Sequence, residues 1–108
     1  MSPRSEYDAA YFTMLRAVEE RDTLLRYREF LEQERRRLDA FAAATRDAGA
    51  ELPRRVRRPV DQTEKALLEA VGRRRTVLLE ELSRAGDRVE AAEAFVAECE
   101  AEVASLRR

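Results

Sequence analysis

The sequence predicts an all-α protein, a long two-helix antiparallel coiled-coil hairpin that pairs into a four-helix bundle or docks on a partner protein. Charged residues make up 40% of the 108 positions, whereas Gly and Pro occur three times each. Such a composition is typical of long helices rather than sheets. Residues 5–48 contain neither Gly nor Pro, and residues 61–106 carry an apolar repeat with alternating three- and four-residue steps. That repeat is the pattern of a left-handed coiled coil.

The first helix is predicted to span residues 5–48. It opens with the segment SEYD, in which the hydroxyl of Ser5 and the carboxylate of Asp8 can form a capping box. Gly49 follows Ala48 at the position where glycine commonly ends a helix.

The connection is predicted to comprise residues 49–60, because Pro53 and Pro59 both interrupt helices. The second helix then spans residues 61–106 and begins at DQTE, where Asp61 can cap the helix and Glu64 can reciprocate. No third element is predicted, so residues 1–108 are expected to form a single hairpin.

The seam of the coiled coil is clearest in the second helix. Eleven of its twelve positions are apolar, and the exception is an arginine. The seam consists of Leu68, Val71, Arg75, Leu78, Leu82, Ala85, Val89, Ala92, Val96, Cys99, Val103 and Leu106.

The first helix can be folded back on this seam so that Phe41 lies opposite Leu68. The same register places Glu34 opposite Arg75, the charged residue of the seam. We expect this pair to fix the register, since a slipped alignment would place each charge against a leucine.

The residue types argue against catalysis and against metal or cofactor binding. The chain contains no His and a single Cys, and it lacks paired catalytic carboxylates and a glycine-rich phosphate loop. Cys99 lies in the predicted seam, where it is expected to be a small buried residue. One cysteine per chain fits a reducing, cytoplasmic location. No apolar run approaches the roughly 20 residues needed to cross a bilayer.

A second apolar stripe runs beside the predicted seam of the first helix. Exposed stripes of this kind usually mark an interface. Three explanations stay open: self-association into a homodimeric four-helix bundle, docking of a different protein, or a broad seam that the other helix covers. The stripe consists of Tyr7, Tyr11, Met14, Val18 and Leu25.

A groove is predicted on one edge of the hairpin. Gly72 and Gly86 flank Leu79 at seven-residue spacing, so they share one helix edge. The neighbouring edge of the first helix is expected to carry arginines at the same spacing. A groove between these edges could accept an acidic helix or another anion. The arginines are Arg21, Arg28 and Arg35.

The middle of the chain is strongly basic. Residues 35–75 carry twelve basic and six acidic groups, although the net charge of the chain is −1. This asymmetry indicates an acidic partner or an anion at that end. Nucleic acid is the alternative partner, held weakly through its phosphates because PRRVRRP has no aromatic residue to stack on bases. The side chains expected to contact an anion are Arg37, Arg54, Arg55, Arg57, Arg58 and Arg74.

The function predicted from these features is that of a non-enzymatic regulatory or adaptor module that binds a protein through the hairpin. One example is the sequestration of a transcription-related protein. A homodimer is the expected assembly, and neither a metal nor a membrane is an expected partner.

Overall fold

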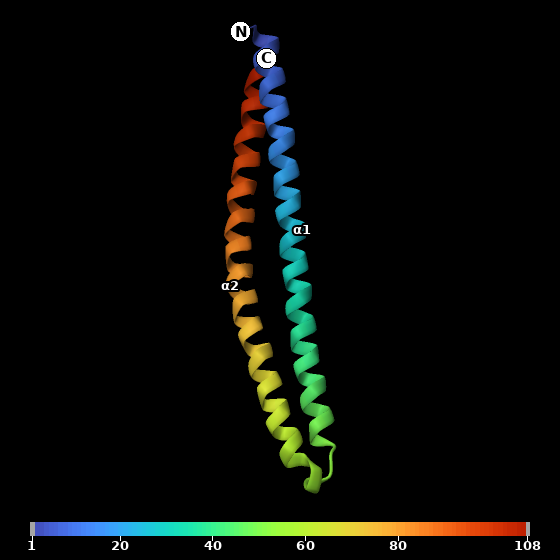
Figure 1. Cartoon of the computed structure of the whole chain (residues 1–108). Helices are drawn as coiled ribbons and strands as arrows, with labels where there is room; N and C mark the ends of the chain where they lie inside the picture. Colours follow the sequence, from blue (N-terminus) through green and yellow to red (C-terminus); the bar gives the residue numbers. More distant parts are fainter. Residues whose placement is uncertain (1, 108) are drawn as a thin grey trace. The chain divides into compact units, whose positions relative to one another are not determined.

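A computed structural model describes residues 2–107. These residues form two helices, α1 (Pro3–Ala50) and α2 (Arg54–Leu106), and contain no strand (Figure 1). The predicted all-α helical hairpin is therefore confirmed. Its pairing into a bundle and its docking on a partner stay predictions.

The N-terminus of α1 lies before the predicted capping box. The hydroxyl of Ser2 accepts a hydrogen bond from the amide of Ser5 at 3.3 Å, and the helix begins at Pro3. Ser2 is thus the capping residue, with proline at the first helical position, where its missing N–H does not matter. The assignment of Ser5 as the cap was wrong because α1 already begins at Pro3, so Ser5 lies inside the helix and its own amide is one of those that need a cap.

The connection between the helices is much shorter than predicted and comprises residues 51–53. Gly49 lies inside α1, and no described glycine has a positive φ. Pro59 lies inside α2. Proline removes the hydrogen bond to the carbonyl of Arg55, but both residues are exposed, so water can satisfy that carbonyl. The predicted start of the second helix at residue 61 was therefore wrong.

Arg57 explains how so short a connection is stabilised. Its Nη2 atom donates to the carbonyl oxygen of Ala50 at 2.7 Å and to that of Leu52 at 3.4 Å. These carbonyls end α1 and its turn, where helices leave acceptors without partners. A side chain from the first turns of α2 thus caps the end of α1.

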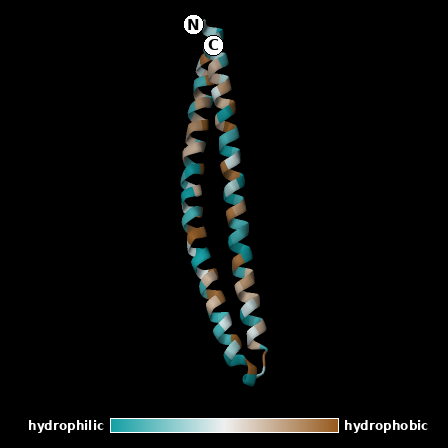
Figure 2. Ribbon diagram, in the orientation of Figure 1, coloured by the Kyte–Doolittle hydropathy of each residue, from teal (hydrophilic) through white to brown (hydrophobic). Residues whose placement is uncertain are grey.

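The hairpin divides into two compact units, and each contains a length of both helices. Unit 1 comprises the described residues up to Glu29 and from Ser83 onward, and unit 2 comprises Phe30–Leu82. Apolar residues occur along both helices in short stretches separated by polar ones (Figure 2). Neither helix holds a described stretch apolar and long enough to cross a membrane.

The core of unit 1 consists of small and medium side chains. Ala17 of α1 packs with Val96 and Cys99 of α2, and Met14 and Val18 cover this cluster. Cys99 is buried and unbridged, as expected from its seam position. Small residues allow the two helices to approach closely, so the cluster fixes their contact in this unit.

The seam of unit 2 is only partly the one predicted. All twelve seam positions predicted for the second helix are buried or half-buried, so that part of the prediction is confirmed. In α1, however, Ala42 is buried and Phe41 is 48% exposed. Alternating steps of three and four from Leu31 fit either Phe41 or Ala42, and the structure buries Ala42. The predicted placement of Phe41 in the seam was therefore wrong, because the small side chain rather than the large one faces the other helix.

Candidate partner-binding surface

Unit 2 carries six large apolar side chains that are exposed, among them Val56 at 40% and Leu79 at 39%. The other four each directly precede a seam residue, and their exposed fractions are 53% for Phe30, 48% for Phe41, 41% for Leu67 and 65% for Val77. We call these four residues the apolar flank. Two of them come from α1 and two from α2.

Helix geometry places the apolar flank on one side of unit 2. Each of its residues directly precedes a buried or half-buried seam residue, as Phe30 precedes Leu31 and Val77 precedes Leu78. A residue lies about 100° round an α-helix from its neighbour in sequence. Because the two helices run in opposite directions, the residues that precede the seam on both helices share the same side of the pair. Leu79, which follows Leu78, lies on the other side.

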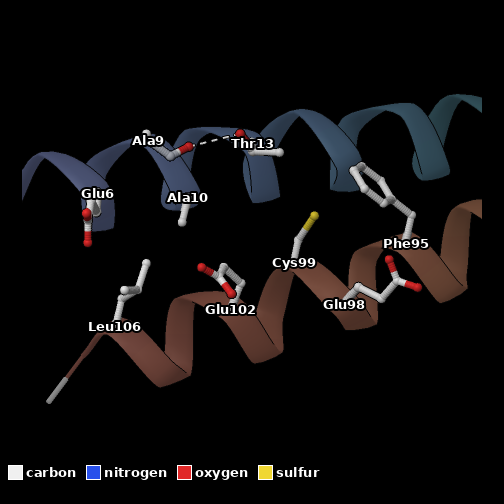
Figure 3. A pocket seen from close by; sticks show the side chains of 9 residues that line it. All are labelled: Glu6, Ala9, Ala10, Thr13, Phe95, Glu98, Cys99, Glu102 and Leu106. Atoms are coloured by element: carbon white, nitrogen blue, oxygen red, sulfur yellow. Dashed lines mark hydrogen bonds between the residues drawn. The ribbon is translucent and has the colours of Figure 1, made fainter. Parts of the chain in front are cut away.

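Unit 1 has a groove of about 620 Å³ between α1 and α2, which we call the acidic groove (Figure 3). Ala10, Cys99 and Phe95 project into the space between the helices. Three carboxylates line the groove, from Glu6 of α1 and from Glu98 and Glu102 of α2, and Phe95 is 47% exposed. The acidic groove thus combines negative charge with an exposed aromatic side chain.

Unit 2 has a second groove of about 600 Å³ beside the connection, which we call the turn groove. Apolar side chains dominate its lining, among them Leu52, Val60 and Leu67. Leu67 also belongs to the apolar flank, so the two surfaces are continuous. The turn groove exists because α2 begins at Arg54, which brings Val60 into the helical pair rather than into a loop.

The stripe predicted on α1 is not separate from the seam. Met14 and Val18 pack on the buried cluster of unit 1, and Tyr7 and Leu25 are half-buried. Tyr11 is 37% exposed and stacks on Tyr7, with ring centroids 6.1 Å apart. Of the three explanations left open, the packing of Met14 and Val18 favours the broad seam covered by the other helix, and the binding role of the stripe stays a prediction.

The residues of the predicted arginine–glycine groove are divided between the two units, so each is described within its own unit. Arg35 donates from Nη1 to Asp39 and from Nη2 to Glu32, both at 3.1 Å, so its guanidinium is engaged on its own helix. A Cβ added at Gly72 or Gly86 would meet no atom within 4 Å. Neither glycine is therefore required by close packing inside its unit.

The other arginines of that prediction lie in unit 1 and differ in burial. Arg21 is half-buried and donates from Nε to Asp22 at 3.1 Å, while Arg28 is exposed. The binding role of this set, with Leu79, stays a prediction.

The charged pair expected to fix the register has different partners. Arg75 donates from Nε to Oδ1 of Asp39 at 2.8 Å, while Glu34 accepts from Arg37 at 2.6 Å. The Arg75–Glu34 pair was therefore wrong. Because the α1 seam runs through Arg35 and Leu38, Asp39 rather than Glu34 flanks Arg75.

The arginines around the connection have three different environments. Arg57 caps α1, and its Nε atom is buried without a hydrogen-bond partner. Arg37 is bound to Glu34. The other predicted arginines are exposed, and within residues 2–107 none of them forms an ion pair. They are Arg54, Arg55, Arg58 and Arg74.

Among the described residues, no group of three or more His, Cys, Asp or Glu side chains could hold a metal ion. Comparison of the chain with protein-family models, with curated proteins and with solved structures finds no match in any of the three.

The apolar flank is the feature that sequence reasoning missed. Its signal was present, because Phe30, Phe41, Leu67 and Val77 each stand one residue before a seam position. Phe41 had been placed in the seam itself, and this hid the regular spacing of the other three. The correct α1 register is needed to recognise the surface.

Proposed function

We propose that the chain is a non-enzymatic binding module that engages a protein partner through the apolar flank of unit 2. One observation supports this proposal above the others: two phenylalanines of unit 2, Phe30 and Phe41, are 53% and 48% exposed on the side that also carries Val77. Exposed aromatic residues gathered on one side of a helix pair are typical of an interface that a partner helix covers. A regulatory or adaptor role, such as sequestering a transcription-related protein, is compatible with this mode of binding.

The apolar flank has the composition expected of an interface core. Aromatic and aliphatic side chains supply contact area, and the Arg37–Glu34 pair stands between Phe30 and Phe41 on α1. Arg37 is 71% exposed, so it can exchange partners when a second protein arrives. Interface centres rich in aromatic residues and bounded by charged groups usually carry most of the binding energy.

The proposal can be tested with two substitutions on either side of Leu78. Val77→Glu places a charge in the apolar flank, whereas Leu79→Glu places the same charge on the opposite side of the pair. We expect an immobilised chain to retain a specific protein from an extract of its source organism, and Val77→Glu to lose it. Leu79→Glu separates the apolar flank from the predicted arginine–glycine groove: this variant should retain the protein if the flank binds it and lose the protein if the groove does. Equal retention by both variants would contradict the apolar flank as the binding surface.

Nucleic acid binding is a second candidate, favoured by the exposed Arg54, Arg55 and Arg58. Binding through phosphates weakens steeply as salt rises. The test compares duplex DNA binding at two salt concentrations, before and after replacing these three arginines with Ala. Absence of binding at low salt would exclude this candidate, while salt-insensitive binding would contradict a phosphate contact.

A further inference from the structure

The turn groove of unit 2 holds one carboxylate in an otherwise uncharged, largely apolar lining. Glu64 is the single charged residue among the described residues that line it, and it lies beside Leu52, Val60 and Leu67. Glu64 is half-buried and takes an inward-facing position of α2, four residues before Leu68. A negative charge is thus held partly out of water, next to apolar side chains.

Gly49 of α1 makes room for this carboxylate. Gly49 is itself buried, and a Cβ added to it would collide with the side chain of Glu64. Glycine is a poor helix former, yet Gly49 lies inside α1. A Cβ added at Gly72 or Gly86 would meet no atom within 4 Å. Gly49 is therefore the one glycine whose missing side chain is replaced by another residue, and the groove is shaped around an acidic side chain.

The carboxylate of Glu64 has no partner inside the described chain. Within residues 2–107, its side chain forms neither an ion pair nor a hydrogen bond. Arg57, the half-buried arginine at the start of α2, donates to the carbonyls of Ala50 and Leu52 instead. A charge that is partly removed from water is costly unless a partner of opposite charge binds it. The groove therefore favours a ligand that brings a cation.

The turn groove lies on the same side of unit 2 as the apolar flank. Ala48 and Thr63 line the groove, and each directly precedes a buried or half-buried position, as the residues of the apolar flank do. Leu67 belongs to both surfaces. A partner helix lying along this side would contact the apolar flank and the groove together, which is the usual way that an amphipathic helix binds a hydrophobic groove.

We propose that the partner of the apolar flank is an amphipathic helix whose apolar face carries one lysine or arginine, and that this basic side chain enters the turn groove and binds the carboxylate of Glu64. The inference rests on the proposed function, because it specifies the chemistry of that partner. The methylene groups of a long basic side chain lie along Leu52, Val60 and Leu67 while its charged end reaches the carboxylate. Hydrogen bonds between two charged groups are stronger than those between neutral ones.

The first experiment selects peptides from a displayed library in which the apolar face of an amphipathic helix is randomised. The immobilised full chain should enrich peptides that carry Lys or Arg at one fixed position among apolar residues. Glu64→Arg should enrich Asp or Glu at that position, and Glu64→Gln should remove the preference for charge. Glu80→Arg changes an exposed acidic residue outside the groove and should select the same peptides as the wild type. Equal enrichment of basic peptides by the wild type and Glu64→Arg would overturn the inference.

The second experiment measures the dissociation constant of one enriched peptide by fluorescence anisotropy. Loss of a hydrogen bond between charged groups corresponds to a change of about tenfold, so we expect Glu64→Gln to weaken binding by about that factor. Replacing the basic residue of the peptide with Gln should weaken binding to the wild-type chain equally, and it should add little once Glu64 is Gln. Circular dichroism checks that the helices of each variant persist. Two losses that multiply would show that the basic residue does not bind Glu64.

The outcomes separate this inference from the proposed function. If Val77→Glu abolishes peptide binding but the peptides show no preference for a basic residue, this inference is wrong and the apolar flank still binds. If the peptides respond to Glu64→Gln but not to Val77→Glu, the groove binds a cation and the apolar flank is not the interface. If the wild-type chain enriches no helical peptide, this inference fails, and the retention of a protein from an extract decides the proposed function by itself.

Discussion

Units 1 and 2 use the same two helices but are held together by different interactions. Among residues 2–107, six of the eight buried apolar residues belong to unit 1, and all six are alanine, valine or cysteine. Unit 2 contains only Leu31 and Ala42. It has instead a set of charged contacts, in which Arg35 and Arg75 both bind Asp39.

Both units expose large apolar side chains, such as Phe12 at 62% in unit 1 and Val77 at 65% in unit 2, so the difference between them lies in the packing of the seam. Small side chains at the seam of unit 1 pack fully against each other, so little apolar surface of the seam stays in water. In unit 2, arginine and aspartate occupy or flank the seam, and the large residues Phe30, Phe41 and Val77 lie outside it. Exposed charged contacts contribute little to stability. Unit 1 should therefore be the more stable part, and unit 2 the part that gains most from a partner.

The largest expected effect on the difference between the two units comes from removing the largest buried side chain of unit 2. Leu31 is 4% exposed, and a buried leucine replaced by alanine typically lowers the free energy of unfolding by about 2–5 kcal/mol. Because Ala42 is the only other buried apolar residue of unit 2 among those described, we expect Leu31→Ala to open that unit before unit 1. Amide hydrogen exchange should show lost protection in residues 30–82, with protection retained in unit 1.

Val96→Ala is the matched change in unit 1, where Val96 is 3% exposed. It removes two methyl groups, which corresponds to about 2 kcal/mol. Because unit 1 is expected to be the more stable part, it should open only when the whole chain unfolds, so Val96→Ala should lower the protection of both units. If Leu31→Ala instead lowered protection equally in both units, the hairpin would unfold as one cooperative body and the comparison would fail.

A smaller effect, of opposite sign, is expected at Gly72 and Gly86, which lie one in each unit. An alanine Cβ at either position would meet no atom within 4 Å, and Gly costs about 1 kcal/mol relative to Ala inside a helix. Each Gly→Ala change should therefore raise the free energy of unfolding by about that amount. Thermal unfolding followed by circular dichroism measures it, with Gly49→Ala as the contrast.

Gly49 provides a useful contrast because its added Cβ would meet the carboxylate of Glu64. That side chain would have to move, so Gly49→Ala should gain less than the other two. If Gly72→Ala or Gly86→Ala destabilised the chain instead, an unseen close contact would be implied at the predicted arginine–glycine groove.

The sequence predicted the second helix better than the first, and the reason is chemical. The seam of α2 is apolar except for Arg75, so its alternating spacing is unambiguous. The seam of α1 passes through Arg21 and Arg35, which no hydrophobicity rule would choose for an inward position. Phe41 is a larger apolar residue than its neighbour Ala42, and both fit alternating steps of three and four from Leu31. The prediction chose Phe41, whereas the structure buries Ala42.

The connection was predicted poorly because its stabilising contact lies outside the local sequence pattern. Gly49, Pro53 and Pro59 indicated a long loop over residues 49–60. The carbonyls at the end of α1 are satisfied by Arg57, which only the folded hairpin brings within 2.7 Å of Ala50. The turn groove could not be foreseen either, because it requires α2 to begin before Pro59.

The smallest expected effect concerns the charged contact between the helices of unit 2. The side chains of Arg75 and Asp39 are 44% and 40% exposed, and exposed ion pairs are worth about 0.2–1 kcal/mol. A double-mutant cycle with Arg75→Ala and Asp39→Ala should give a coupling energy in that range, falling as salt is added. The measurement is chemical denaturation of the four species at two salt concentrations.

The same cycle with Glu34→Ala in place of Asp39→Ala decides the register. Glu34 binds Arg37 on its own helix at 2.6 Å, so we expect no coupling between Glu34 and Arg75. A coupling between Glu34 and Arg75 as large as that with Asp39 would restore the register in which Phe41 is buried, and the apolar flank would lose one of its four residues. The coupling energy of Arg75 shows which carboxylate lies beside it and therefore whether Phe41 is exposed. This weak ion pair is thus a direct test of the apolar flank, the surface to which binding is assigned in the proposed function.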